Sequence, residues 1–80
     1  MTDLITRAVI GTKYQHRRDD LLSEGYTIMF EHTDFVGVFS KLRHRNGNIV
    51  IITCDYERRT ITQKTNGKIV HTEEVCKSWL

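Results

Sequence analysis

The chain has 80 residues, of which 39% are hydrophobic and 28% are charged, with 12 basic and 10 acidic side chains. This length suits one domain with a modest core, and the composition excludes a disordered chain. No apolar run approaches the roughly 18 residues of a membrane span, and the N-terminus lacks the basic start and apolar core of a signal peptide. We therefore expect a single soluble, cytoplasmic domain over residues 1–80, with Cys54 and Cys76 reduced.

Residues 2–24 are predicted to be helical. Thr2 and Asp3 precede an apolar pattern and are typical of a capped helix start. Gly11 and Thr12 interrupt this pattern, and a second helical stretch runs over residues 13–24. Gly25 is placed to end it in the left-handed conformation. A short strand is the alternative for residues 2–11.

The period of the apolar residues changes to two after Gly25, which indicates strands. The predicted strands cover residues 26–31, 35–44, 48–56, 59–65 and 68–72, within a sheet over residues 26–73 and before a short tail at residues 74–80. Asn46-Gly47 and Asn66-Gly67 are strong signals for tight hairpins. The predicted fold is therefore α+β, an N-terminal helical segment followed by a five-stranded antiparallel β-meander.

Two-residue hairpin loops would fix which residues share a face of the sheet. A loop at Asn46-Gly47 would pair Arg43 with Val50, a loop at Glu57-Arg58 would pair Cys54 with Ile61, and Asn66-Gly67 would set Gln63 opposite Val70. The face expected under the helix then holds Phe35, Phe39, Val50, Ile52, Cys54, Ile61 and Val70. The face expected to be uncovered holds Val36, Val38, Leu42, Ile49, Ile51 and Ile69, with Thr53, Thr60, Thr62 and His71 towards its edge. Because exposed apolar faces usually mark interaction sites, the first six residues of the uncovered face are the predicted interface of a homo-oligomer.

The basic residues are concentrated in the predicted sheet, where residues 41–68 carry seven of them against two acids. The predicted nucleic-acid-binding residues are Lys41, Arg43, His44, Arg45, Arg58, Arg59, Lys64 and Lys68. Alternate residues of a strand are roughly 7 Å apart on one side, a spacing suited to contacting successive phosphates. Nothing indicates recognition of bases, so binding should be electrostatic and sensitive to salt. The alternative is that these cations only protect sheet edges from pairing with other molecules.

Residue types that carry catalysis or hold metals are present without the usual spacing. His71 and Cys76 are five residues apart with no second pair of ligands, so no metal and no cofactor are expected. A small acid-base ribonuclease remains an alternative, because His44, Arg43, Arg58, Glu57 and Tyr56 could converge. No catalytic residue is predicted on this basis.

Two further groups have a structural and a functional interpretation. His16-Arg17-Arg18 precedes Asp19-Asp20, which is more typical of internal salt bridges than of a binding site. Trp79 near the C-terminus is expected to dock on the sheet, or else to anchor another protein.

A helix followed by five antiparallel strands is also the order of elements in Sm-like RNA-binding proteins. The segments 35–39 and 48–51 loosely resemble the first motif of that family, over about a third of the chain. The chain departs from the motif because no Asp precedes the asparagine, Asn46-Gly47 lies elsewhere, and a tight Asn66-Gly67 turn joins the last two strands. The resemblance therefore does not assign the chain to that family.

The functional hypothesis from sequence is a non-enzymatic RNA- or nucleic-acid-binding accessory or regulatory protein that acts as a homo-oligomer. A compact, single-domain chain without proline suits a small regulator from a phage or mobile element. One alternative is a protein-binding inhibitor of a host enzyme or of a defence or toxin system, and the other is the ribonuclease.

Overall fold

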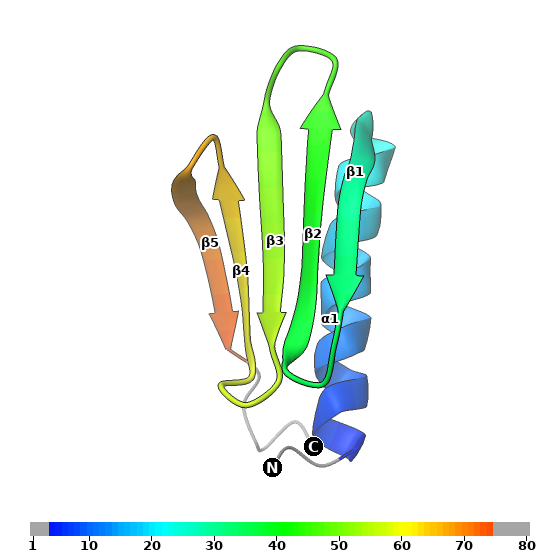
Figure 1. The fold of residues 1–80 in the computed structure, drawn as a ribbon, viewed down its shortest axis with the longest axis vertical. Helices are drawn as coiled ribbons and strands as arrows, with labels where there is room; N and C mark the ends of the chain where they lie inside the picture. The colour runs from blue at the N-terminus through cyan, green and yellow to red at the C-terminus, as the bar shows by residue number, and fades with distance from the viewer. Residues whose placement is uncertain (1–3, 75–80) are drawn as a thin grey trace.

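One helix and five strands make up the part of the chain that our computed structural model describes, residues 4–74 (Figure 1). The elements are α1 (Leu4–Ser23), β1 (Tyr26–Thr33), β2 (Gly37–His44), β3 (Ile49–Asp55), β4 (Thr60–Thr65) and β5 (Lys68–Glu74). The strands form one antiparallel sheet in the order β1-β2-β3-β4-β5. The predicted α+β fold with a β-meander is therefore confirmed.

The helix is continuous through the position where the sequence predicts a break. Gly11 and Thr12 both lie inside α1, and the Thr12 hydroxyl donates to the Ala8 carbonyl at 2.9 Å. The helix ends as predicted, because Gly25 adopts a positive φ of 100°. Its N–H donates to the Leu22 carbonyl at 3.1 Å, which satisfies one of the last carbonyls of the helix.

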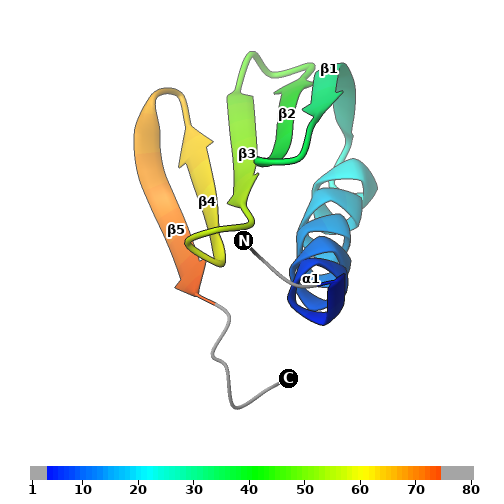
Figure 2. The ribbon, with the colours of Figure 1, turned by 60° about the horizontal axis from the view of Figure 1, so that its bottom comes forward.

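The helix packs on one face of the sheet, and Figure 2 shows it on the side of β1 to β3, away from β5. Its buried side chains are Ile10, Tyr14 and Leu21, whose spacings of four and seven place them on one helical stripe. The sheet contributes Leu42, Val50, Ile52, Cys54, Tyr56 and Ile61 to the same core. Val9, Tyr26 and Val38 pack around it, half-buried.

The hairpin between β2 and β3 is one residue longer than predicted. His44 and Asn48 close it, because the His44 N–H donates to the Asn48 carbonyl at 2.9 Å and the Gly47 N–H donates to the His44 carbonyl at 2.9 Å. Gly47 has a φ of 99°, whereas Asn46 is not among the residues with positive φ. This combination is a three-residue loop with a glycine bulge rather than a two-residue turn. Arg43 therefore lies opposite Ile49, not Val50.

Next to their turns, the other two predicted hairpins have the expected pairs. Cys54 lies opposite Ile61 across the turn between β3 and β4. Asn66 and Gly67 have φ values of 51° and 85°, as a two-residue turn with two left-handed residues requires. A bulge farther along β5 then sets Gln63 opposite His71 instead of Val70.

A shift of one residue exchanges the faces of a strand, so the predicted membership of the two faces is wrong in β2. Leu42 and Val38, predicted on the uncovered face, lie on the face covered by α1, and Leu42 is fully buried. Phe39, predicted under the helix, lies on the opposite face next to Lys41 and Arg43. Ile49, Ile51 and Ile69 are on the uncovered face as predicted. Val36 belongs to the turn before β2 and is 51% exposed.

Gly37, at the start of β2, lies opposite Asp55. A Cβ atom added to it would lie 1.8 Å from the Cys54 carbonyl oxygen. Glycine is needed here because the backbone of β3 approaches too closely for any side chain.

Candidate nucleic-acid interface

The face of the sheet turned away from α1, called the outer face below, is organised in rows that cross the strands. One of them, called the central row, contains Phe30, Lys41, Ile51, Lys64 and Ile69, one from each strand. Thr27, Arg43 and Ile49 form the row on its hairpin side, and His32, Phe39, Thr53, Thr62 and Thr72 form the row on its other side. Beyond these, Gly37, Asp55, Thr60 and Glu74 lie at the far end. The outer face is therefore basic and apolar towards one end and acidic at the other.

Three cations of this face have no ionic partner among residues 4–74. Lys41, Arg43 and Lys64 form no ion pair with any other residue among those described. The helix differs, since the Arg18 guanidinium is 3.0 Å from the Glu31 carboxylate and the Lys13 ammonium is 3.3 Å from Glu73. The cations of the outer face are thus available to an anion from outside.

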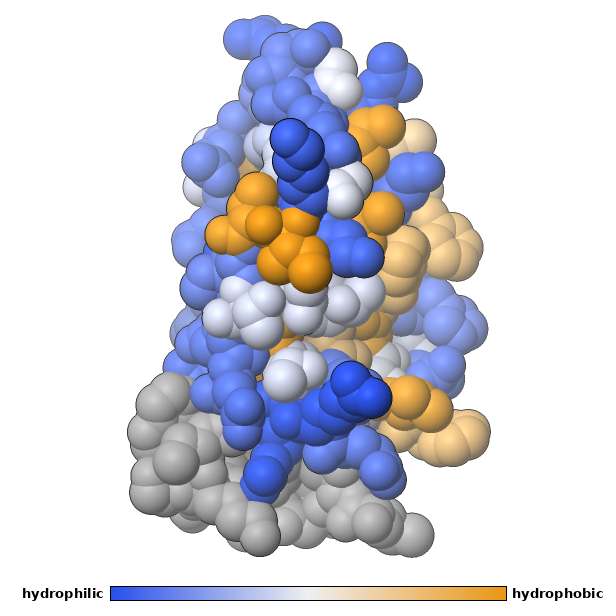
Figure 3. Space-filling model, turned by 90° about the vertical axis from the view of Figure 1, so that its left-hand side faces the viewer, coloured by the Kyte–Doolittle hydropathy of each residue, from blue (hydrophilic) through white to orange (hydrophobic). Residues whose placement is uncertain are grey.

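Two phenylalanines accompany these cations. The Phe30 and Phe39 rings pack edge to face, with centroids 6.0 Å apart and an interplanar angle of 63°. Phe30 is 54% exposed and lies directly opposite Lys41. Figure 3 shows orange, apolar surface along the right-hand side of the view, which is the side of the outer face, and a second orange patch near the centre.

A bulge in β1 is what brings Phe30 to this face. The register shifts between Ile28 and Phe30, so Met29 is the extra residue. Without it, strict alternation from Ile28 would turn Phe30 towards α1. The same shift directs Glu31 to the covered face, where the Ser40 hydroxyl donates to its carboxylate at 2.7 Å.

Asn66 joins the two hairpins at the basic end of the sheet. Its N–H donates to the Ile49 carbonyl at 2.8 Å, and its side-chain oxygen accepts the Ile49 N–H at 2.9 Å. Its amide nitrogen also donates to the side-chain oxygen of Asn48 at 3.2 Å. Arg45 and Lys68 are exposed in these hairpins, so the predicted binding residues Lys41, Arg43, Arg45, Lys64 and Lys68 share one end of the molecule.

His44 lies beside these residues but has a structural role. It points to the covered side, where its ring packs against Tyr26 with centroids 5.0 Å apart. The Asn46 N–H donates to Nδ1 at 3.1 Å, so Nε2 carries the proton and donates to the Glu24 carbonyl at 3.2 Å. His44 therefore connects the hairpin to the end of the helix.

Arg58 and Arg59 belong to the turn between β3 and β4, at the opposite end of the sheet from Arg43 and Arg45 (Figure 1). The seven residues of β3 separate the two ends by about 20 Å. The five residues considered for a ribonuclease are divided in the same way, because His44 and Arg43 lie at one end and Tyr56, Glu57 and Arg58 at the other. Sequence reasoning was wrong to bring them together.

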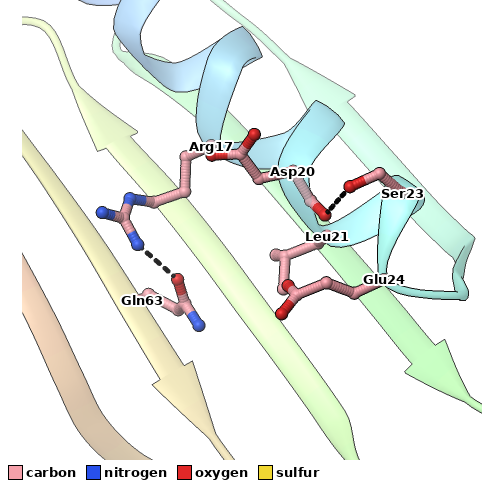
Figure 4. Close-up of a pocket in the computed structure, with 6 residues that line it drawn as sticks. All are labelled: Arg17, Asp20, Leu21, Ser23, Glu24 and Gln63. Carbon is pink, nitrogen blue, oxygen red and sulfur yellow. Dashed lines mark hydrogen bonds between the residues drawn. The ribbon is translucent and has the colours of Figure 1, made fainter.

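A pocket of about 430 Å³ lies between α1 and β4. Figure 4 shows Arg17 reaching from the helix to Gln63, with a hydrogen bond of 2.9 Å from its guanidinium to the amide oxygen. Asp20, Leu21, Ser23 and Glu24 complete the lining. Its only described cation is held by Gln63 and its two carboxylates would repel an anion, so this pocket is a poor site for a phosphate.

Neither a metal site nor a reactive thiol is found in the part of the chain that the structure describes. No group of three His, Cys, Asp or Glu side chains comes together within residues 4–74. Cys54 is buried as predicted, and burial, with a smaller contribution from the charge of Asp55, raises its pKa to about 12. Cys76 and Trp79 lie outside the described residues.

Over the same residues, α1 is not apolar enough to span a membrane. Comparisons of the chain with protein-family models, with curated proteins and with solved structures gave no match. Function is therefore inferred from the geometry of the outer face.

Proposed function

We propose that the chain is a non-enzymatic binding protein for RNA or another nucleic acid, with an accessory or regulatory role, and that it acts as a homo-oligomer. The observation that carries this proposal is the position of Phe30 and Phe39 beside Lys41 and Arg43 on one open sheet face. Aromatic rings stack on bases while cations attract phosphates, and a sheet can present both at once.

Single strands suit this face better than a duplex. The bases of a duplex are already stacked on one another, whereas those of a single strand are free to stack on exposed rings. Each stacked base contributes about 1–3 kcal/mol with little dependence on sequence. Lys41 and Arg43 are two residues apart on β2, and Lys64 lies two strands away in the central row, so three cations share the outer face with the aromatic pair.

Fluorescence anisotropy with labelled single-stranded RNA of random sequence tests the proposal. We expect binding at 50 mM salt that weakens as salt is raised. In the variant Lys41→Ala/Arg43→Ala, the slope of log K against log salt should fall by about 1.4, because each cation accounts for about 0.7 on a single strand. Phe30→Ala should lower the affinity and leave the slope unchanged.

Arg43→Ala and Arg58→Ala form a matched pair, since each removes one exposed arginine and changes the net charge equally. Only Arg43→Ala should weaken binding. Equal effects would mean that RNA responds to the overall charge and would contradict a site on the outer face. No binding at 50 mM salt would eliminate the proposed function.

A second candidate is the inhibitor that binds another protein, and the turn before β2 favours it. Phe35 is 83% exposed there, beside the half-exposed Val36. The backbone of the turn is hydrogen-bonded, because the Asp34 carboxylate accepts the N–H groups of Val36 and Gly37 at 2.9 and 3.0 Å. An exposed aromatic ring is a typical anchor in protein interfaces. This function would be favoured over the first if Phe35→Ala lost inhibition of the target. The variant should then bind RNA as the wild type does, or neither protein should bind RNA.

A further inference from the structure

A pocket of the outer face surrounds Gly37, at the far end from the basic hairpins, and is called the Gly37 pocket below. It has about 270 Å³ of space, and the residues that line it include the aromatic His32 and Phe39 and the acidic Asp34 and Asp55. Neither Lys nor Arg is among its described lining residues. A small pocket with two carboxylates beside aromatic rings is suited to a cation.

The carboxylates of the Gly37 pocket are not neutralised by a Lys or Arg of residues 4–74. Asp55 forms no ion pair within this range, and Asp34 pairs with His32 at 3.2 Å. Lys41 is a cation of the same face without an ionic partner in the described part of the chain. It lies about 14 Å along β2 from Gly37, so it does not reach the pocket of its own chain.

A second copy can bring its Lys41 to the Gly37 pocket. Phe39 lies midway between Lys41 and Gly37 on β2, and its row passes through Thr53 on β3, the middle strand. When two outer faces meet around a two-fold axis along this row, every strand lies antiparallel over the same strand of the other copy. Lys41 of each copy then lies over Gly37 of the other, and the contact occurs twice. Stacked sheets cross at only about 30°, which the four-carbon stem of a lysine accommodates this close to the axis.

The same axis brings other opposite charges together. Asp55 of each copy lies over Ile51 of the other, and Ile51 is flanked by Lys41 and Lys64 on the neighbouring strands. An axis parallel to the strands would instead place the two basic ends on each other. Five strands about 4.8 Å apart, and seven residues of β3 at about 3.4 Å each, give each outer face about 570 Å². Two such faces cover about 1,100 Å², above the roughly 1,000 Å² that a specific interface needs.

We infer that two copies of this chain pack outer face against outer face, with Lys41 of each copy in the Gly37 pocket of the other. The two sheets form the inside of this dimer, and each α1 lies on the outside. The regulatory role of the dimer rests on the proposed function, because the dimer covers the face assigned to RNA. The homo-oligomer then controls access to the nucleic-acid site, since RNA and the second copy compete for it.

Sedimentation equilibrium at tens of micromolar should give about twice the chain mass of 9.4 kDa. Lys41→Met keeps an unbranched side chain and removes the charge, so it should weaken the dimer by about tenfold or more, since it acts at two contacts. Asp34→Asn/Asp55→Asn should also weaken it. Asparagine keeps the side-chain oxygen that accepts two backbone N–H groups at each position, so both turns are retained.

Combining Lys41→Met with the two asparagine substitutions tests the contact itself. The combined variant should lose less affinity than the product of the separate losses, because either change alone leaves charges unpaired in the interface. Lys68→Met is the matched control, since Lys68 lies in the row of the buried Val50 on the covered face, and it should leave the dimer intact. A monomeric wild-type chain would overturn the inference, as would separate losses that simply multiply or equal losses in the two Lys→Met variants.

Single-stranded RNA of about ten nucleotides should convert the dimer into a complex with one chain. RNA that binds the dimer without separating the copies would overturn the inference. A dimer that binds no RNA would support the face-to-face packing and contradict the nucleic-acid function, whereas a monomer that binds RNA would contradict the dimer alone. The two failures are therefore distinguishable.

Discussion

The hydroxyl groups of Tyr14 on α1 and Ser40 on β2 are hydrogen-bonded to each other in the interior of the protein. Ser40 is fully buried, and its own proton is donated to the Glu31 carboxylate at 2.7 Å. Tyr14 must therefore donate to Ser40, which gives a directed chain from Tyr14 through Ser40 to Glu31. The Arg18 guanidinium forms an ion pair with the same Glu31 carboxylate and so extends this chain. This chain joins the helix to the first two strands by polar contacts in an otherwise apolar core.

Removing either hydroxyl should destabilise the protein, and by different amounts. Tyr14→Phe removes one hydrogen bond and leaves Ser40 bonded to Glu31, for a loss of about 1 kcal/mol. Ser40→Ala leaves the buried Tyr14 hydroxyl without an acceptor, for a loss of about 1–3 kcal/mol. Urea unfolding should show that the double variant loses less than the sum of the two. Strict additivity would contradict a direct bond between them.

Glu31 should make stability depend on pH in the acid range. The hydrogen bond from Ser40, followed by the interaction with Arg18, holds the pKa of Glu31 below its usual 4.5. A carboxyl whose pKa is lowered by folding stabilises the folded state above its unfolded pKa, and this contribution is lost as pH falls through the folded pKa. Glu31→Gln should therefore be less stable than wild type at pH 7, with a difference that shrinks as pH is lowered below about 4. Glu24→Gln is the control, and a similar pH-dependent loss in that variant would contradict the assignment.

Cys54 should be unreactive in the folded protein. Burial raises its pKa to about 12, so the thiolate that attacks disulfide reagents is scarce at pH 8 and shielded from solvent. In a Cys76→Ser background, a thiol reagent should label the native chain slowly and the chain in urea rapidly. Fast labelling without denaturant would show that the strand carrying Cys54 opens readily.

Gly11 and Gly37 should respond oppositely to the same substitution. Gly11 lies inside α1 with no atom within 4 Å of an added Cβ, so Gly11→Ala should stabilise the protein by about 0.5–1 kcal/mol. Gly37→Ala would place a Cβ against the Cys54 carbonyl and should cost at least about 3 kcal/mol. Urea midpoints measure both changes. A Gly37→Ala protein of wild-type stability would show that β2 and β3 can separate locally at little cost.

The sequence was sufficient for the element order, for the end of the helix at Gly25 and for the turn at Asn66-Gly67, because each depends on local residues. At Asn46-Gly47 the same dipeptide led to the wrong prediction of a two-residue turn. Asn-Gly fits a two-residue turn with two positive φ values and also a three-residue loop in which only the glycine is left-handed. The sequence did contain an indication against the two-residue turn. The register of that turn places Lys41 and Arg43 on the covered face, where unpaired charges are unfavourable.

The bulges at Met29 and Val70 could not be predicted in the same way. They depend on how each edge strand meets its neighbour, and the residues around them alternate only loosely. For this reason Phe30, which the bulge at Met29 brings beside Lys41, was missing from the residues predicted for the site. The five cations at the hairpin end were found because charge clustering is visible without a register.

The number of residues in the loop between β2 and β3 decides which side chains of β2 lie on each face of the sheet. Removing one residue from the loop would shift the pairing of β2 with β3 by one residue. Every side chain of β2 would then change to the other face of the sheet relative to β3. Lys41 and Arg43 would then turn towards α1, and Leu42 would turn to solvent. Natural variants are therefore expected to lack insertions and deletions between His44 and Asn48.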